Sequence, residues 1–187
     1  MIKFARSKTD QLAQADFFRY AAFLLEYPND AWREKLAHIQ EELDRLPSSS
    51  ASKALQRFAS YALAANPRSF ETSYVDTFDF SNSTSLFLTS RGRADASIQR
   101  MDLMSYSLYF EEAGYALSSG DLPDNLIALL ELLSVLDDTM RAQFAKKMKA
   151  DVKLLYEALT ETDMDEYALL IKAIVDVLSS QDRKAVV

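Results

Sequence analysis

Carboxylates are the main candidates for chemistry in this sequence, which has 28 Asp and Glu residues but one His and no Cys. A di-iron carboxylate site in a helical protein needs paired Glu-x-x-His motifs, and His38 alone cannot supply them. Asp137 and Asp138 resemble the start of an Asp-rich magnesium motif, but Arg141 occupies its third acidic position. Since adjacent surface aspartates usually cap helices, we predict no metal site, and a helical metal-dependent enzyme remains only as an alternative.

The sequence also lacks the residues that other kinds of active site require. Without Cys there can be no thiolate metal site, cysteine nucleophile or disulfide. The three glycines form no Walker or dinucleotide-binding fingerprint. His38 has no Ser and Asp partners near it in the sequence, which favours a structural or exposed histidine. We therefore predict that the protein is not an enzyme, with no catalytic residues and no cofactor.

The charge balance disfavours nucleic acid as a partner. Lys and Arg number 21, so the formal net charge is −7, and the isoelectric point is near 4.8. A local run of lysines at positions 146, 147, 149 and 153 spreads around its helix, which is typical of a solvated face. The sequence predicts a basic or apolar partner instead.

Three acidic residues form a second pattern. Asp124, Glu131 and Asp138 are seven residues apart, so on one continuous helix they would lie within about 20° of a line. The helix expected from Pro123 is otherwise apolar on all sides. The stripe is either the one edge that a buried helix exposes to water, or the acidic wall of a groove with an apolar floor. Such a groove would suit an amphipathic peptide that carries Arg or Lys.

An aromatic ladder is a third pattern. Phe70, Tyr74 and Phe78 follow each other at four-residue spacing, which places them on one face of a helix. Aromatic stripes of this kind belong either to the core or to a binding groove, and the sequence alone leaves both open.

Helical periodicity predicts the elements that position these residues. Scarce Gly and Pro argue against a β-sandwich or barrel, and apolar residues recur at three- and four-residue steps. We predict an all-α fold, a single-domain bundle of about seven to nine helices over residues 1–187. The helices are expected over residues 10–26, from 29 or 30 to Pro47, from 48–50 to 66, from 68, from 94 to Gly114, from Pro123, over 138–159 and over 163–178. Residues 179–187 are expected to fray.

The helical pattern breaks over residues 80–93. Five small polar residues are followed by an apolar triplet, Leu86, Phe87 and Leu88. Long irregular connections in compact domains are uncommon and often functional. We expect this segment to be more mobile than its flanking helices and to border a binding surface.

Three segments carry a resemblance to a known family. They are residues 24–32, with Leu-Leu-Glu-Tyr-Pro; residues 74–80, 84–89 and 91–92, with Tyr-Val-Asp-Thr-Phe-Asp-Phe; and Tyr109, Gly114 and residues 121–131, with Asp-Leu-Pro-Asp-Asn-Leu and then Leu-Glu. In order and spacing they resemble the nitrate reductase assembly chaperones (NarJ type, delta subunit), a branch of the TorD/DmsD family of molybdoenzyme chaperones. Relatives carry His where this chain has Asn125, which cannot titrate near neutral pH.

The resemblance implies an all-α, TorD-like chaperone that is not an enzyme. Such a chaperone binds the N-terminal segment of the catalytic (alpha) subunit of a respiratory nitrate reductase and supports molybdenum cofactor insertion. A chaperone of another molybdoenzyme, of the dimethyl sulfoxide reductase type, is the alternative. Together with the acidic stripe and the aromatic ladder, the resemblance gives these candidate peptide-binding residues: Tyr74, Phe78, Phe80, Leu86, Asp124, Asn125 and Glu131.

The expected location is the cytoplasm. The basic N-terminus is followed by Thr9, Asp10, Gln11 and Gln14 where the apolar core of a signal peptide would lie. The longest nearly apolar segment, residues 126–136, is far shorter than the roughly 20 residues that span a bilayer. We predict no membrane insertion, and a monomer is favoured.

Overall fold

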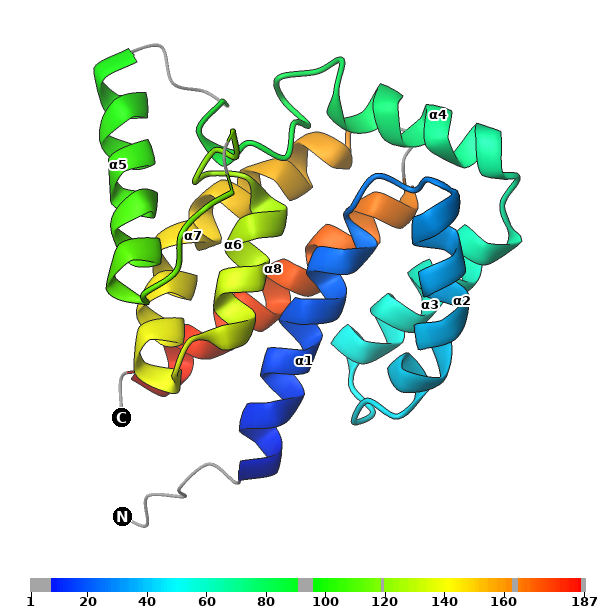
Figure 1. Cartoon of the computed structure of the whole chain (residues 1–187), viewed down its shortest axis with the longest axis horizontal. Helices are drawn as coiled ribbons and strands as arrows, with labels where there is room; N and C mark the ends of the chain where they lie inside the picture. Colours follow the sequence, from blue (N-terminus) through cyan, green and yellow to red (C-terminus); the bar gives the residue numbers. More distant parts are fainter. Residues whose placement is uncertain (1–7, 91–95, 119, 163–164, 186–187) are drawn as a thin grey trace.

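The chain folds into a helical bundle, as the computed structural model shows (Figure 1). The structure describes residues 8–90, 96–118, 120–162 and 165–185, and the side chains of all these except 8–13, 165 and 181–185. Eight α-helices and one short 3₁₀-helix lie in these residues, which confirms the predicted all-α class. They are α1 (Lys8–Leu24), α2 (Asp30–Asp44), α3 (Ser50–Ala64), α4 (Pro67–Phe78), η1 (Leu88–Ser90), α5 (Ala96–Glu112), α6 (Leu126–Val135), α7 (Asp138–Leu159) and α8 (Asp165–Ala185).

Polar side chains begin the helices where the sequence predicts. Asn29 accepts the Trp32 amide and caps α2. Ser49 caps α3 in a reciprocal capping box with Ser52. Each cap satisfies a backbone N–H that has no partner inside its helix, which fixes where the helix starts.

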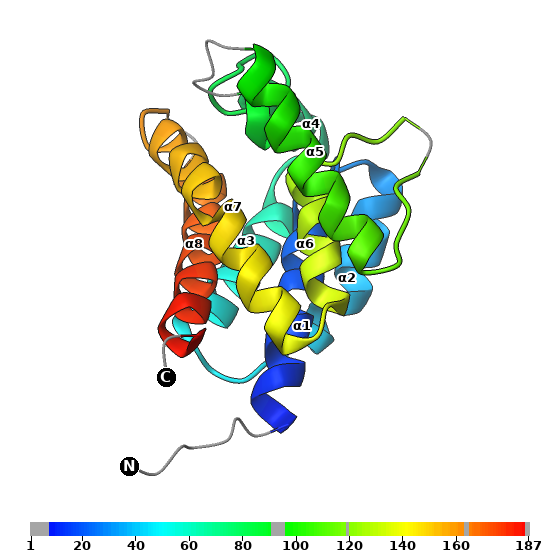
Figure 2. The same cartoon turned by 90° about the vertical axis from the view of Figure 1, so that its left-hand side faces the viewer.

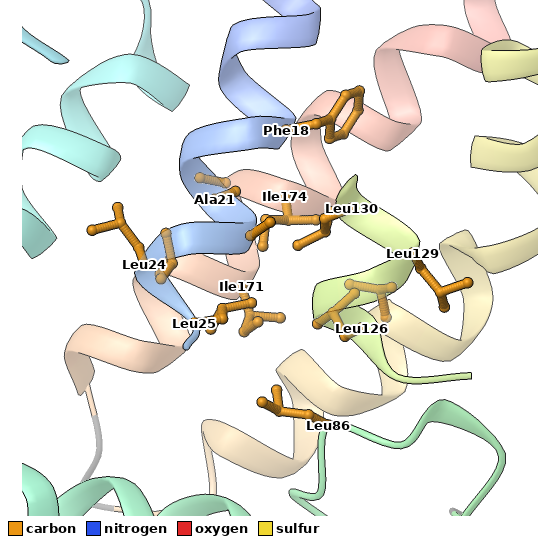
Figure 3. Packing of buried hydrophobic residues seen from close by; sticks show 14 of the residues in the cluster. Phe18, Ala21, Leu24, Leu25, Leu86, Leu126, Leu129, Leu130, Ile171 and Ile174 are labelled. Atoms are coloured by element: carbon orange, nitrogen blue, oxygen red, sulfur yellow. The ribbon is translucent and has the colours of Figure 1, made fainter. Parts of the chain in front are cut away.

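Buried hydrophobic side chains from all eight α-helices form one core. α1 packs along α6, and α8 packs along α7 and against α3. Figure 3 shows Leu25, which directly follows α1, with Leu126 and Leu130 of α6 and Ile171 and Ile174 of α8 around one interior space. All five are fully buried. On the outside, α2 and α3 cover one side of the bundle, α4 crosses one end, and α5 forms the opposite edge (Figure 1).

Most helix bounds lie within about two residues of the prediction, but the start of α6 and the end of α8 differ by three residues or more. α6 starts at Leu126, three residues after Pro123, because Asn125 is in extended conformation and caps the helix with its own side chain. α8 continues to Ala185, where the sequence predicted an end at Leu178. Among the described residues, no helix combines the length and the apolar character needed to cross a membrane.

Candidate functional site

The segment that joins α4 to η1 docks onto the N-terminal end of α6. The Leu126 amide donates to the Leu86 carbonyl (N···O 2.9 Å), and the Leu88 amide donates to the Asp124 carbonyl (3.0 Å). Phe87 and Asn125 form an isolated antiparallel bridge between these two bonds. The irregular segment is thus fixed by backbone hydrogen bonds to residues far along the chain.

Leu86 and Thr84 anchor the same segment from the inside. Leu86 is buried and points into the core near Leu126 (Figure 3). Thr84 is also buried, and its hydroxyl donates to the carbonyl of Thr77 on α4. Leu86, a candidate for peptide contact, therefore acts in this structure as a core anchor of the segment.

Asp124 is the most unusual polar residue in this region. Its side chain is 1% exposed. One carboxylate oxygen, Oδ2, accepts the Thr89 amide (3.0 Å) and the Thr89 hydroxyl (2.6 Å). The other, Oδ1, is buried and accepts no hydrogen bond from any described residue. An unpaired buried carboxylate oxygen costs free energy, and native proteins rarely retain one without a reason.

A hollow of about 390 Å³ lies beside Asp124. Its apolar wall includes Phe78 of α4, Leu103 of α5, Phe87 and Leu122. Phe87 is 38% exposed and Leu122 is 50% exposed, so the wall opens to solvent. The hollow can accept an apolar group together with an N–H donor that pairs with Asp124.

Asn125 is occupied by the fold. Its side-chain oxygen accepts the Ile127 amide (2.9 Å) as the cap of α6. In this chain, the residue at the position of the family's His therefore starts a helix.

The aromatic ladder lies in the core. Phe70, Tyr74 and Phe78 are each at most 7% exposed, and all three rings contact Tyr167 of α8. The Tyr74 hydroxyl donates to the Leu25 carbonyl (3.0 Å), and burial raises the pKa of Tyr74. Of the three, Phe78 also borders the hollow at Asp124. Phe80 differs, since it follows the end of α4 and is 79% exposed.

The predicted acidic stripe is wrong. It required one helix from Pro123 to Asp138, but α6 covers only Leu126–Val135. Asp124 precedes α6 and is buried, while Asp138 lies in the first turn of α7 and pairs with Arg141 (2.8 Å). Of the three acids only Glu131 lies on α6, where it is exposed.

Glu131 borders a second, separate hollow of about 270 Å³. Apolar side chains such as Phe110 and Leu132 line it, and Asp121 lies on its rim. Partial burial, and then the charge of Asp121, raise the pKa of Glu131. Burial also raises the pKa of Glu26, with a smaller contribution from Glu131. This second hollow therefore carries negative potential, and no described cation pairs with Glu131. A buried Glu131 would need a donor, and two candidates in the sequence, Arg91 and Arg93, lie outside the described residues.

Residues considered for enzymatic chemistry have structural roles. Arg141, which fills the third position of the incomplete magnesium motif, is buried and donates to the carbonyls of Leu133 and Leu136 at the end of α6. His38 is exposed, as predicted, and its Nδ1 lies 2.6 Å from the Glu34 carbonyl. In the part of the chain that the structure describes, no three His, Asp or Glu residues are grouped to hold a metal ion.

The sequence did not identify Thr89 or Leu122 as site residues. Thr89 is 35 positions from Asp124, and nothing in its local pattern shows that it will meet the carboxylate. The apolar triplet 86–88 contained a signal for docking, since Leu86 and Leu88 are buried while Phe87 between them is exposed. That alternation is typical of an extended segment with one buried face.

Comparison with known proteins extends over most of the chain. It is 23% identical over 163 residues to the probable nitrate reductase molybdenum cofactor assembly chaperone NarJ of Bacillus subtilis, covering 87% of this chain and 88% of that protein. The chain is 26% identical over 166 residues to the nitrate reductase molybdenum cofactor assembly chaperone NarJ of Escherichia coli K12, which covers 84% of this chain and 67% of that protein. The nitrate reductase-like protein NarX of Mycobacterium tuberculosis is 28% identical over 158 residues, which are 82% of this chain but only 23% of NarX. No family model matches. The chain is thus similar along most of its length to nitrate reductase assembly chaperones.

Proposed function

We propose that this protein is a chaperone for the assembly of a respiratory nitrate reductase. It binds the N-terminal segment of the catalytic subunit and supports insertion of the molybdenum cofactor. The observation that carries the proposal is Asp124, which lines an open hollow with an apolar wall and keeps a buried Oδ1 without a described partner. The similarity to NarJ chaperones supports nitrate reductase as the enzyme served, in preference to a dimethyl sulfoxide reductase.

The proposed binding mode follows from the apolar side chains and the Asp124 carboxylate that line the 390 Å³ hollow. Apolar side chains of an amphipathic segment pack on Phe87 and Leu122, which are partly exposed in the free protein. An Arg or Lys of the same segment donates to Asp124 Oδ1. A hydrogen bond to a charged group contributes about 1.5–3 kcal/mol, and apolar burial contributes roughly 25 cal/mol per Å². Over several side chains burial dominates the affinity, and Asp124 sets the position of the basic residue.

Two further candidate contacts extend the surface. Phe80 offers an almost fully exposed ring at the end of α4. Glu131, with Asp121 beside it, offers a second acidic position at its own hollow. A bound segment with two basic residues would reach both acidic positions. Tyr74 and Leu86 support this surface from beneath, since both are buried.

The stretch similar to this chain makes up 23% of NarX, a longer protein that is itself described as nitrate reductase-like. This supports nitrate reductase as the enzyme that the proposed chaperone serves. We place the protein in the cytoplasm, acting through binding, with no catalysis or cofactor of its own.

Titration calorimetry with a synthetic peptide of the catalytic subunit's N-terminal segment tests this function. Asp124→Asn keeps a carbonyl oxygen for Thr89 but replaces the free oxygen by an NH₂ group, so we expect about tenfold weaker binding or worse. Asp44→Asn makes the same chemical change on an exposed part of α2 and should leave affinity unchanged. A peptide that fails to bind the wild type, or binds Asp124→Asn equally well, contradicts the proposal.

A further inference from the structure

One face of α5 carries four exposed apolar side chains. Ile98, Met101, Met104 and Leu108 are 51%, 70%, 68% and 54% exposed. At 100° per residue they lie within about 120° of one another around the helix. We call these four residues the α5 stripe. A contiguous exposed apolar surface on a soluble protein marks an interaction site more often than isolated side chains do.

The face of α5 roughly opposite the stripe carries the buried Tyr106 and Phe110, and the flank next to Ile98 packs on α7. Asp102 pairs with Lys147 of α7 (2.7 Å), and the Tyr106 hydroxyl donates to Asp151 (2.8 Å). The ring of Tyr109 packs on Phe144 of α7. In Figure 1 α5 forms one edge of the bundle, and Figure 2 shows this edge toward the viewer with α5 in front. The α5 stripe therefore faces away from the rest of the chain.

We infer that a second copy of this protein covers the α5 stripe, in an antiparallel α5–α5 dimer. The flanking charges argue for this occupant. Arg100 and Glu111 are both exposed, and their spacing of eleven residues places them about 20° apart, on the same flank of the stripe. Neither forms an ion pair with another described residue.

Antiparallel pairing makes these charges complementary. When two identical helices pack antiparallel, the same flank of each helix faces the other, so Arg100 of each copy meets Glu111 of the second copy. With the two-fold axis near Ser105, these two residues lie within about one residue rise of each other along the axis. Near the axis the apolar side chains of one copy then alternate with those of the other, as in a self-complementary interface.

The size of the α5 stripe sets the expected affinity. A stable dimer buries roughly 800 Å² per partner, and four side chains on one helix supply less than that. The dimer is therefore reversible, with a dissociation constant in roughly the micromolar range.

Analytical ultracentrifugation of the full chain tests the dimer. We expect the average mass to rise from monomer toward dimer between about 1 µM and about 500 µM protein. Met104→Glu places two like charges beside the axis and should leave only monomer. Leu154→Glu changes a residue of similar exposure on α7 (49%) and should leave association unchanged.

A charge swap tests the orientation. Arg100→Glu and Glu111→Arg should each weaken association about tenfold, because each replaces two attractive pairs by repulsive ones. Combining both substitutions restores the pairs and should restore association. A wild type that stays monomeric, a dimer that survives Met104→Glu, or a double variant that is not restored overturns the inference. A monomer whose stripe instead binds the peptide of the proposed function also overturns it.

Discussion

The aromatic ladder of α4 forms a cluster with Trp32 and Tyr167, and this cluster adjoins the hollow at Asp124. The two regions differ in how completely their side chains are packed and hydrogen-bonded. In the cluster, Phe70 stacks on Trp32 and Tyr167, and the Tyr74 hydroxyl has its acceptor. At the hollow, Asp124 keeps a buried oxygen without a described partner, and Phe87 remains partly exposed. Complete packing and hydrogen bonding stabilise the fold. An unpaired oxygen and a partly exposed ring at an open surface are instead available to a ligand. The two regions should therefore respond differently to substitution.

The largest effect on stability is expected at Phe70. Phe70→Ala removes a ring that contacts Trp32, Phe58, Tyr61 and Tyr167. The free energy of unfolding should fall by about 3–5 kcal/mol, the usual cost of a buried Phe→Ala change. Urea unfolding followed by circular dichroism measures this loss. If Phe70→Ala costs less than about 1 kcal/mol, the cluster is not a packed core.

Leu86→Ala should combine both kinds of effect. Leu86 anchors the segment 80–90 to the core, so its truncation should lower the free energy of unfolding by about 2–5 kcal/mol. It should also weaken peptide binding, because the segment that carries Phe87 is released. Phe80→Ala is the matched change at an exposed site, and it should weaken binding with little loss of stability. If Leu86→Ala leaves peptide affinity unchanged, the docked segment does not form the binding surface.

Thr89→Val is expected to have a smaller effect. Val keeps the shape of Thr but cannot donate to Asp124 Oδ2, while the Thr89 amide still can. We expect a loss of about 1–3 kcal/mol, since the buried carboxylate then loses one of its two donors. Thermal unfolding measures it. Thr72→Val on α4 is a control, since the Thr72 hydroxyl bonds only to a carbonyl of its own helix at an exposed position.

The smallest effect is the pH dependence from Glu131. The folded state raises the pKa of Glu131 above its unfolded value, through partial burial and then Asp121. The folded state therefore binds more protons, so stability should increase as pH falls through the folded pKa toward 4.5, and be lowest above it. Because the side chain is exposed, solvent screens the effect. Glu131→Gln should slightly raise stability at pH 7 and flatten the profile from pH 7 to 5. An unchanged slope would show that Glu131 does not contribute.

Local signals in the sequence were enough to predict much of the fold. Asn29 and Ser49 begin α2 and α3, and α7 runs over the predicted residues, because capping and apolar periodicity act within a few positions. α6 differed because the Asn125 cap outweighed Pro123 as a start signal. Asp124 was selected as an exposed acid on a helix, whereas its burial depends on a contact with Thr89, 35 residues away. Such long-range docking has no periodic signature in a single sequence.

A double-mutant cycle tests the central claim most directly. Each basic residue of the catalytic subunit's N-terminal peptide is replaced in turn by Gln, and each peptide is titrated against wild type and Asp124→Asn. One basic residue should be coupled to Asp124, so that its replacement weakens binding to the wild type but hardly weakens binding to Asp124→Asn further. A coupling of about 1 kcal/mol or more is expected for a buried charge pair. If the effects of Asp124→Asn and of every peptide substitution are simply additive, Asp124 does not receive a basic side chain and the account is wrong.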